Sequence, residues 1–186
     1  MSASCDKLPS RLEWKMFRGD AERYKNALYG IFQRDFLSGT LQFQGKNVDI
    51  IHEKFFEGKE RSFWHIISEG NEDTERELNT ERCASLPWAK PLIEDDGKCE
   101  YYRIWTKWHD KTNRNRYYIW CTAVDYMVIL EDRDTHFKLI TAYNVLPYKV
   151  KSYEKDYKKY AESFAGLKIS TNFASHFSRN VERKCG

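Results

Sequence analysis

Residues 126–145, YMVILEDRDTHFKLITAYNV, constrain the fold of this chain more than any other stretch. Two apolar runs flank a polar turn, which is typical of a β-hairpin even though the turn lacks a glycine. Because side chains alternate between the faces of a strand, one face of the second run is predicted to carry Phe137, Leu139, Thr141, Tyr143 and Val145. Thr141 and Tyr143 would then present two neighbouring hydroxyl groups. Both are also ordinary strand residues, since Thr and Tyr favour strands.

A second pair of strand-like runs precedes this hairpin, at residues 101–108 and 116–122. The four runs together predict an antiparallel meander of about four strands. In the first run Arg103, Trp105 and Lys107 would share one face. Such a face is either an ordinary exposed sheet surface with a protective lysine or a surface that binds RNA.

The N-terminal part is predicted to form a long helix. Ser10 and Glu13 have the spacing of a capping box, and Gly39 would end the helix. An apolar stripe at helical spacing follows the cap: Phe17, Ala21, Tyr24, Leu28 and Ile31. Residues 40–51 then predict two short strands joined by a glycine-containing turn.

Residues 73–86 are predicted to form another helix. Leu78, Arg82 and Leu86 recur at a spacing of four residues, so Arg82 would lie on the same side as two apolar residues. Burying a guanidinium alone is costly. Arg82 is therefore expected to point along the rim of the core or to be paired.

Prolines and glycines divide the remainder of the chain. Pro87 is expected to end the preceding helix, and Pro91 to keep residues 88–90 extended. A last helix is predicted from aromatic residues spaced as one helical face, Tyr153, Tyr157, Tyr160 and Phe164. Gly166 would cap this helix, and a polar basic tail would follow at 167–186.

His65 stands in the otherwise apolar run 63–68. A lone histidine in such a run is more often a core residue with a satisfied ring than a catalyst. The other histidines lie beside charged or turn-like residues: His52, His109, His136 and His176. His65 is thus the one imidazole expected in ordered apolar surroundings, and both interpretations of it stay open.

Composition limits the class of protein. The aromatic fraction of 16% indicates a folded domain and also offers surfaces on which bases could stack. A net charge of +3 does not by itself indicate a nucleic-acid binder, so any basic surface must be local. The 5 cysteines are scattered and form no zinc motif. With no signal peptide or membrane span in the sequence, we expect a cytoplasmic protein without a metal or cofactor and without contact with a membrane.

Several segments together resemble a family of phage- and mobile-element-encoded proteins with the barnase–EndoU–colicin–RelE-like nuclease fold. The similar segments occur in the family's order between about residue 40 and residue 160. They are LQFQGK, FWHIISEG, ERCASLPWAKPLIE, a Trp-rich strand, DYMVILEDR and FKLITAYNV. The ordered set carries the resemblance, because no single segment is specific.

This resemblance implies an α+β fold, with a helical N-terminal part packed on a twisted antiparallel sheet of about four to six strands and a C-terminal helix. It also implies metal-independent cleavage of RNA, with His65, Arg82, Thr141 and Tyr143 as the catalytic residues. The expected organisation is an N-terminal helical segment at 1–39, a nuclease-like domain at 40–166 and the tail at 167–186.

These residue types suit the chemistry. Histidine transfers protons near neutral pH, arginine binds phosphate oxygens with a planar fork, and hydroxyl groups orient the phosphate. Candidates for substrate binding are Trp105, Lys107, Trp88 and Lys90. The function expected is an endoribonuclease, either a toxin or a phage-encoded host-directed hydrolase with an immunity or host protein as partner. The alternative is a non-catalytic phage protein that binds RNA or inhibits a host or defence protein.

Overall fold

The computed structural model describes residues 8–70, 76–95 and 99–165, and over these residues the fold is α+β, as predicted. A six-stranded, mostly antiparallel sheet has the strand order β1-β2-β8-β7-β6-β5. Its strands are β1 (Gln42–Phe43), β2 (Lys46–Asp49), β5 (Tyr102–His109), β6 (Arg114–Cys121), β7 (Tyr126–Asp132) and β8 (Phe137–Asn144). The meander β5–β8 is antiparallel, which confirms the expected hairpins, and β2 pairs with β8 in parallel.

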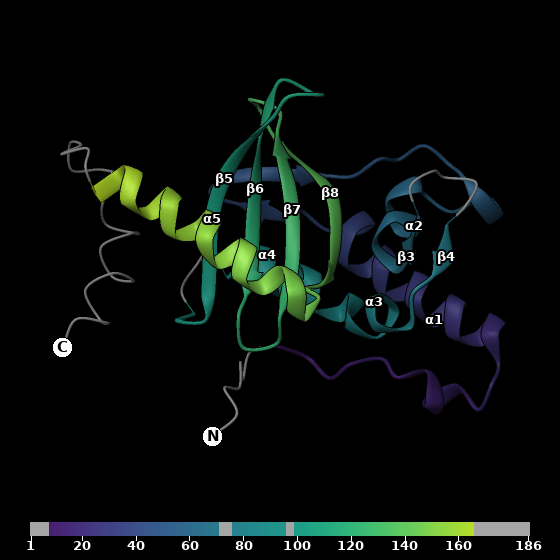
Figure 1. Cartoon of the computed structure of the whole chain (residues 1–186). Coiled ribbons are helices and arrows are strands. Elements are labelled where there is room, and N and C mark those ends of the chain that lie inside the picture. The colour runs from purple at the N-terminus through teal and green to yellow at the C-terminus, as the bar shows by residue number, and fades with distance from the viewer. Residues whose placement is uncertain (1–7, 71–75, 96–98, 166–186) are drawn as a thin grey trace.

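Helices surround this sheet (Figure 1). The α-helices are α1 (Ala21–Phe32), α2 (Arg61–Ile67), α3 (Thr80–Ser85), α4 (Ala89–Glu94) and α5 (Pro147–Ala165). Shorter helical turns are Trp14–Phe17, Gln33–Leu37, Phe56–Gly58 and Leu86–Trp88, and β3 (Ser68–Glu69) pairs with β4 (Glu77–Leu78) as a small hairpin. Figure 1 shows α5 crossing one face of β5–β8, whereas α2 and α3 lie beside β8.

The two faces of the sheet support separate apolar clusters. On one face Val128 and Leu139 pack in the main core, to which α1 contributes Leu28 and α2 contributes Phe63. On the opposite face Trp105, Trp120, Met127 and Ile129 are buried, and the tyrosines of α5 pack against them. The last predicted helix is therefore confirmed, and its aromatic face covers this second cluster. Gly166 and the tail lie outside the described residues.

A β-bulge in β8 overturns the single-face prediction for this strand. Ile129 pairs with Thr141, but the next residue of β7, Leu130, pairs with Leu139, so Ile140 is an extra residue. Phe137 and Leu139 consequently face the main core. Thr141 and Tyr143 face the side that α5 covers, because their β7 partners belong to the second cluster. The bulge thus carries the two hydroxyl groups away from the main core.

The first helix begins later than predicted. Residues Trp14–Phe17 form a short 3₁₀ turn, and Asp20 caps α1 by accepting a hydrogen bond of 2.9 Å from the backbone N–H of Arg23. Gly19 has φ of +86°, a conformation that glycine adopts without strain. The capping box at Ser10 was wrong, because the first residue of the apolar stripe, Phe17, ends this turn and the α-helix begins only at Ala21.

Two predictions around the third helix were also wrong. Leu78 lies in β4 and is exposed, and α3 starts at Thr80 with Asn79 as its cap, while residues 71–75 lie outside the described part. Residues 88–90 are not extended, because Pro91 stands in the first turn of α4. Proline is tolerated there, since the N–H groups of the first turn have no partner within the helix.

Candidate functional site

The end of helix α2, the start of helix α3 and strand β8 meet at the candidate site. Asn79 caps α3 by accepting a hydrogen bond of 3.0 Å from the backbone N–H of Arg82. This cap fixes Arg82 in the first turn of α3, directly beside the C-terminus of α2. Its guanidinium Nη1 donates to the main-chain oxygen of Ser68 at 2.8 Å and, at 3.5 Å, to that of His65.

The carbonyl groups at the end of α2 explain these bonds. The last carbonyls of a helix have no partner within it, so side chains or water must satisfy them. Thr141 also donates to the main-chain oxygen of His65, at 3.2 Å. The structure therefore brings His65, Arg82 and Thr141 together, but the contacts to His65 are made through its backbone. The His65 side chain itself is half-buried.

Tyr143 supplies the fourth predicted residue of the site. The Arg82 guanidinium lies over its ring, 5.4 Å from the centroid, which is a cation–π distance. The Tyr143 hydroxyl is 2.8 Å from the hydroxyl of Tyr153 on α5. One of these hydroxyls donates to the other. Only one of their two protons is used in this bond, so the second can be donated to an acceptor nearby.

A pocket of about 280 Å³ opens beside these groups. It is formed where β3, α3, the end of β8 and the start of α5 meet. Its lining residues are Glu69, Asn79, Glu81, Arg82, Tyr143, Asn144, Leu146, Tyr148, Lys149 and Tyr153. The pocket therefore combines two cations, two carboxylates and two amides with a hydroxyl pair. Arg82 and Tyr143 belong to this lining, whereas His65 and Thr141 do not.

Burial changes the proton affinity of the two central groups. It lowers the pKa of Arg82, an effect that the charge of Glu69 opposes, but a guanidinium remains protonated at any physiological pH. Burial, together with the hydrogen bond to Tyr153, raises the pKa of Tyr143 well above its usual range. Tyr143 therefore keeps its proton and acts as a neutral hydrogen-bond donor or acceptor.

The exposed apolar side chains at the pocket are Leu146 and Tyr148. Tyr148 is 74% exposed, and Lys149 lies over its ring with Nζ 5.6 Å from the centroid. An exposed aromatic ring at the mouth of a polar pocket offers a planar surface on which a base can stack.

The residues predicted to bind substrate do not line this pocket. Trp105 is 1% exposed and lies beneath α5, and Trp88 is buried with its Nε1–H donated to the main-chain oxygen of Pro9. The faces of these two indole rings are therefore covered. Lys107 pairs with Asp156 of α5 at 3.3 Å, and Lys90 lies 3.8 Å from Glu94.

Several pocket residues were not predicted from the sequence, notably Glu69, Asn79, Lys149 and Tyr153. Asn79 could have been identified from the sequence as a helix cap. It is followed two positions later by Glu81, and an Asn with a glutamate in the next turn is typical of a helix start. No sequence pattern indicated Glu69, since its position depends on the β3–β4 hairpin. It accepts a hydrogen bond of 3.0 Å from the side chain of Asn79.

No family model, no curated protein and no solved structure matches the chain. Over the described ranges no helix is long and apolar enough to cross a membrane. Within the same ranges no three His, Cys, Asp or Glu side chains are grouped as a metal site would need.

Proposed function

We propose that this protein is an endoribonuclease that cleaves RNA without a metal ion, and that the Arg82–Tyr143 pocket binds the scissile phosphate. The observation that carries the proposal is the half-buried Arg82 guanidinium, held by the Ser68 carbonyl and by the Tyr143 ring at the edge of a pocket. A guanidinium that is fixed before the substrate arrives stabilises phosphate charge without reorganising. The resemblance to the nuclease family points to the same residue.

In the proposed reaction the 2′-oxygen of a ribose attacks the neighbouring phosphorus. The bond from phosphorus to the 5′-oxygen breaks, which leaves a 2′,3′-cyclic phosphate and a free 5′-hydroxyl. Arg82 stabilises the added negative charge on the phosphorane. Tyr143 donates to Tyr153 in this reaction, and the hydroxyl proton of Tyr153 passes to the departing 5′-oxygen. The proton that a general base takes from the 2′-hydroxyl restores the pair afterwards.

A general base must accept the proton of the 2′-hydroxyl. Glu69 is a candidate, because it lines the pocket and is oriented by Asn79. His65 is the other candidate, since its backbone lies at the site and an imidazole suits proton transfer near neutral pH. Removing a general base lowers the rate typically by about 10²–10⁴-fold, so substitutions separate the two.

The test incubates the purified protein with total RNA in excess EDTA and identifies the ends of the products. We expect 2′,3′-cyclic phosphates from the wild type and an approximately 10²–10³-fold slower reaction for Arg82→Gln. Arg82 also donates to carbonyls at the end of α2, so its substitution changes stability as well as phosphate binding. Tyr143→Phe is therefore a second variant, which removes only the hydroxyl and keeps the ring. Arg23→Gln, which removes the same charge from the exposed face of α1, is the matched control and should keep full activity. Intact RNA with the wild type, or equal rates for all variants, refutes the proposal.

A second candidate function is a non-catalytic protein that binds RNA or a host protein. One observation favours it: Nη1 of Arg82 and the hydroxyl of Thr141 both satisfy carbonyls of α2, as purely structural residues would. In that case Arg82→Gln would lower stability, and no RNA turnover would be measured for any variant. A pull-down with a stoichiometric protein partner and no turnover would support this function.

A further inference from the structure

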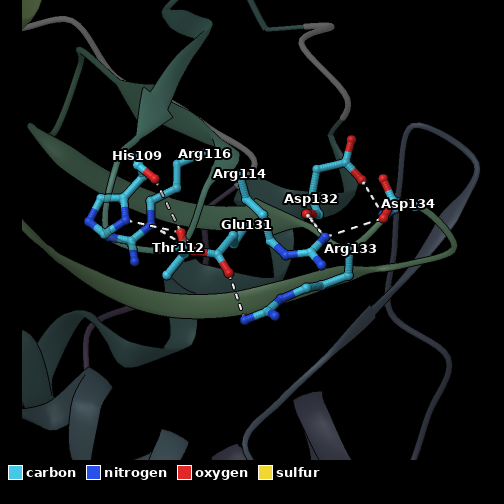
Figure 2. A network of polar contacts seen from close by, with 8 residues as sticks. All are labelled: His109, Thr112, Arg114, Arg116, Glu131, Asp132, Arg133 and Asp134. Carbon is cyan, nitrogen blue, oxygen red and sulfur yellow. Dashed lines mark hydrogen bonds and ion pairs between the residues drawn. The ribbon is translucent and has the colours of Figure 1, made fainter.

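A second polar cluster lies on the same sheet face, at the other end of the strands (Figure 2). Its centre is Glu131 of β7, whose side chain is fully buried. The carboxylate accepts hydrogen bonds from Thr112 at 2.8 Å and from Nε of Arg116 at 3.1 Å, and Arg133 Nη2 lies 2.6 Å from its other oxygen. We call these four residues and His109 the Glu131 cluster.

The register of the sheet places further cations around this carboxylate. Lys107, Arg116, Glu131 and Lys138 are direct partners across β5, β6, β7 and β8, so their side chains leave the sheet on one face. These four residues are three cations and one anion, and the row continues into β2, where Asp49 is the partner of Lys138. Asp156 of α5 pairs with Lys107, so the cations and anions of the row balance. Among the described residues Lys138 forms no ion pair, so its ammonium is the cation of the row that remains available to a ligand.

The arginines of the cluster keep donors for a ligand. Arg116 gives the carboxylate only its Nε–H, and Arg133 gives only Nη2, so further N–H groups of each guanidinium stay available. Both side chains are partly exposed, with accessible fractions of 19% and 33%. The buried carboxylate thus holds two guanidinium planes in fixed positions, which lowers the entropy lost when they bind an anion.

His109 adds a polar group to the cluster beside the two arginines. Its Nδ1 is 3.0 Å from the hydroxyl of Thr112. The Thr112 hydroxyl donates its single proton to Glu131. In the bond between Thr112 and His109 the donor is therefore the Nδ1–H of the imidazole. The second ring nitrogen, Nε2, points away from Thr112, as Figure 2 shows, and it has no hydrogen-bond partner among the residues that the structure describes.

The cluster and the pocket lie on the same face of the sheet. Tyr143 of the pocket pairs with Met127, and Glu131 lies four residues further along the same strand. At ~3.4 Å per residue the two sites are about 14 Å apart along β7. Figure 1 shows that α5 crosses the strands and leaves their ends at the β5–β6 and β7–β8 turns uncovered.

We propose that the Glu131 cluster, together with Lys138 beside it on β8, binds a second phosphate of the same RNA strand, a few nucleotides from the phosphate held by Arg82. This inference rests on the proposed function, because it needs RNA in the Arg82 pocket. The ligand is a phosphodiester of single-stranded RNA, since the sheet face presents separate cations on neighbouring strands and Tyr148 offers a stacking surface for an unpaired base. Long substrates would therefore bind more tightly than short ones.

The test measures fluorescence anisotropy with 2′-O-methyl RNA, which lacks the nucleophile and stays intact. Two labelled lengths, a trinucleotide and a decanucleotide, are titrated at several salt concentrations. Lys138→Gln and Arg133→Gln should weaken decanucleotide binding about 3–10-fold and lower its salt slope by about 0.7, which corresponds to one phosphate contact on a single strand. Trinucleotide binding should not change. Arg23→Gln is the control of equal charge, and circular dichroism verifies folding.

The outcomes separate this inference from the proposed function. If Lys138→Gln and Arg133→Gln behave like Arg23→Gln on the decanucleotide, the second phosphate site is refuted, while loss of trinucleotide binding in Arg82→Gln still supports the pocket. If neither RNA binds the wild type, both proposals are refuted. Lys138→Gln is the decisive variant because Lys138 has no ion pair within the described ranges whose loss could unfold the protein.

Discussion

The hydroxyl of Thr141 donates a hydrogen bond of 3.2 Å to the main-chain oxygen of His65, across 76 residues of sequence. This bond joins the part of β8 that lies beyond its pairing with β2 to the C-terminus of α2. Arg82 reaches the same oxygen from α3, so three elements that are distant in sequence share one carbonyl group. The position of the candidate site therefore depends on how α2 ends.

Thr141→Val should lower the free energy of unfolding by about 1 kcal/mol, the net value of one hydrogen bond in a protein. The methyl groups of valine fill nearly the same volume, but the His65 carbonyl loses the bond from Thr141, while the longer bond from Arg82 remains. Urea denaturation measures the difference, and Thr141→Ser, which retains the hydroxyl, is the control. A valine variant as stable as the wild type would show that this bond does not hold α2 against β8.

Tyr143→Phe and Tyr153→Phe should each lower the free energy of unfolding by about 1 kcal/mol, and the double variant should lose little more. Both changes remove the same bond, the 2.8 Å contact between the two hydroxyls. The double-mutant cycle should therefore give a coupling energy of about 1 kcal/mol. Additive losses would mean that the two hydroxyls do not bond to each other in solution.

Tyr126→Phe should stabilise the protein by about 1 kcal/mol and reduce its sensitivity to alkali. The Tyr126 hydroxyl is buried without a hydrogen-bond partner among the described residues, which is unfavourable. Burial also raises its pKa well above the usual range. A raised pKa in the folded state means that the unfolded chain loses this proton first, so the free energy of unfolding falls as pH rises above roughly 10.

Denaturation by urea between pH 8 and pH 11 measures this effect. The slope of unfolding free energy against pH should become less negative in Tyr126→Phe. Tyr148→Phe is the control, because Tyr148 is exposed and its substitution should leave the slope unchanged. An equal slope in Tyr126→Phe would mean that Tyr126 ionises alike in both states.

The sequence predicted the elements whose periodicity is local. Strands β5 to β8 and helix α5 follow from alternating or helical spacing, and the structure confirms them. The bulge at Ile140 was not predictable in this way, because an extra residue depends on pairing with β7 rather than on the strand's own pattern. The helix start at Asn79 was missed because Leu78 fits a helical stripe, although pairing with Ser68 holds it in a strand.

The residues of the candidate site were likewise predictable only where a local pattern indicates them. Arg82 was expected at the rim of the core because a charged group cannot be buried alone, and it lies half-buried there with carbonyl partners. The hydroxyl pair required Tyr153, whose aromatic spacing predicted only a packing face. No local pattern relates Tyr153 to Tyr143, since their contact depends on the angle at which α5 crosses the sheet.

Glu131→Gln should lower the free energy of unfolding by about 3 kcal/mol at neutral pH, because it leaves Arg116 and Arg133 without their shared carboxylate. Burial raises the pKa of Glu131, but the bonds from Thr112 and Arg116 and the charge of Arg133 outweigh it, so the pKa is lowered. A lowered pKa in the folded state stabilises the protein above the unfolded value of roughly 4.3, and this stabilisation is lost as pH falls through the folded value.

Urea denaturation from pH 3 to pH 7 measures this dependence. The free energy of unfolding of Glu131→Gln should lie below that of the wild type by a constant amount above about pH 5.5, and this deficit should narrow below pH 4. Glu100→Gln, at an exposed carboxylate, should match the wild type throughout. A deficit for Glu131→Gln that does not change with pH would mean that the pKa of Glu131 is the same in the folded and the unfolded chain.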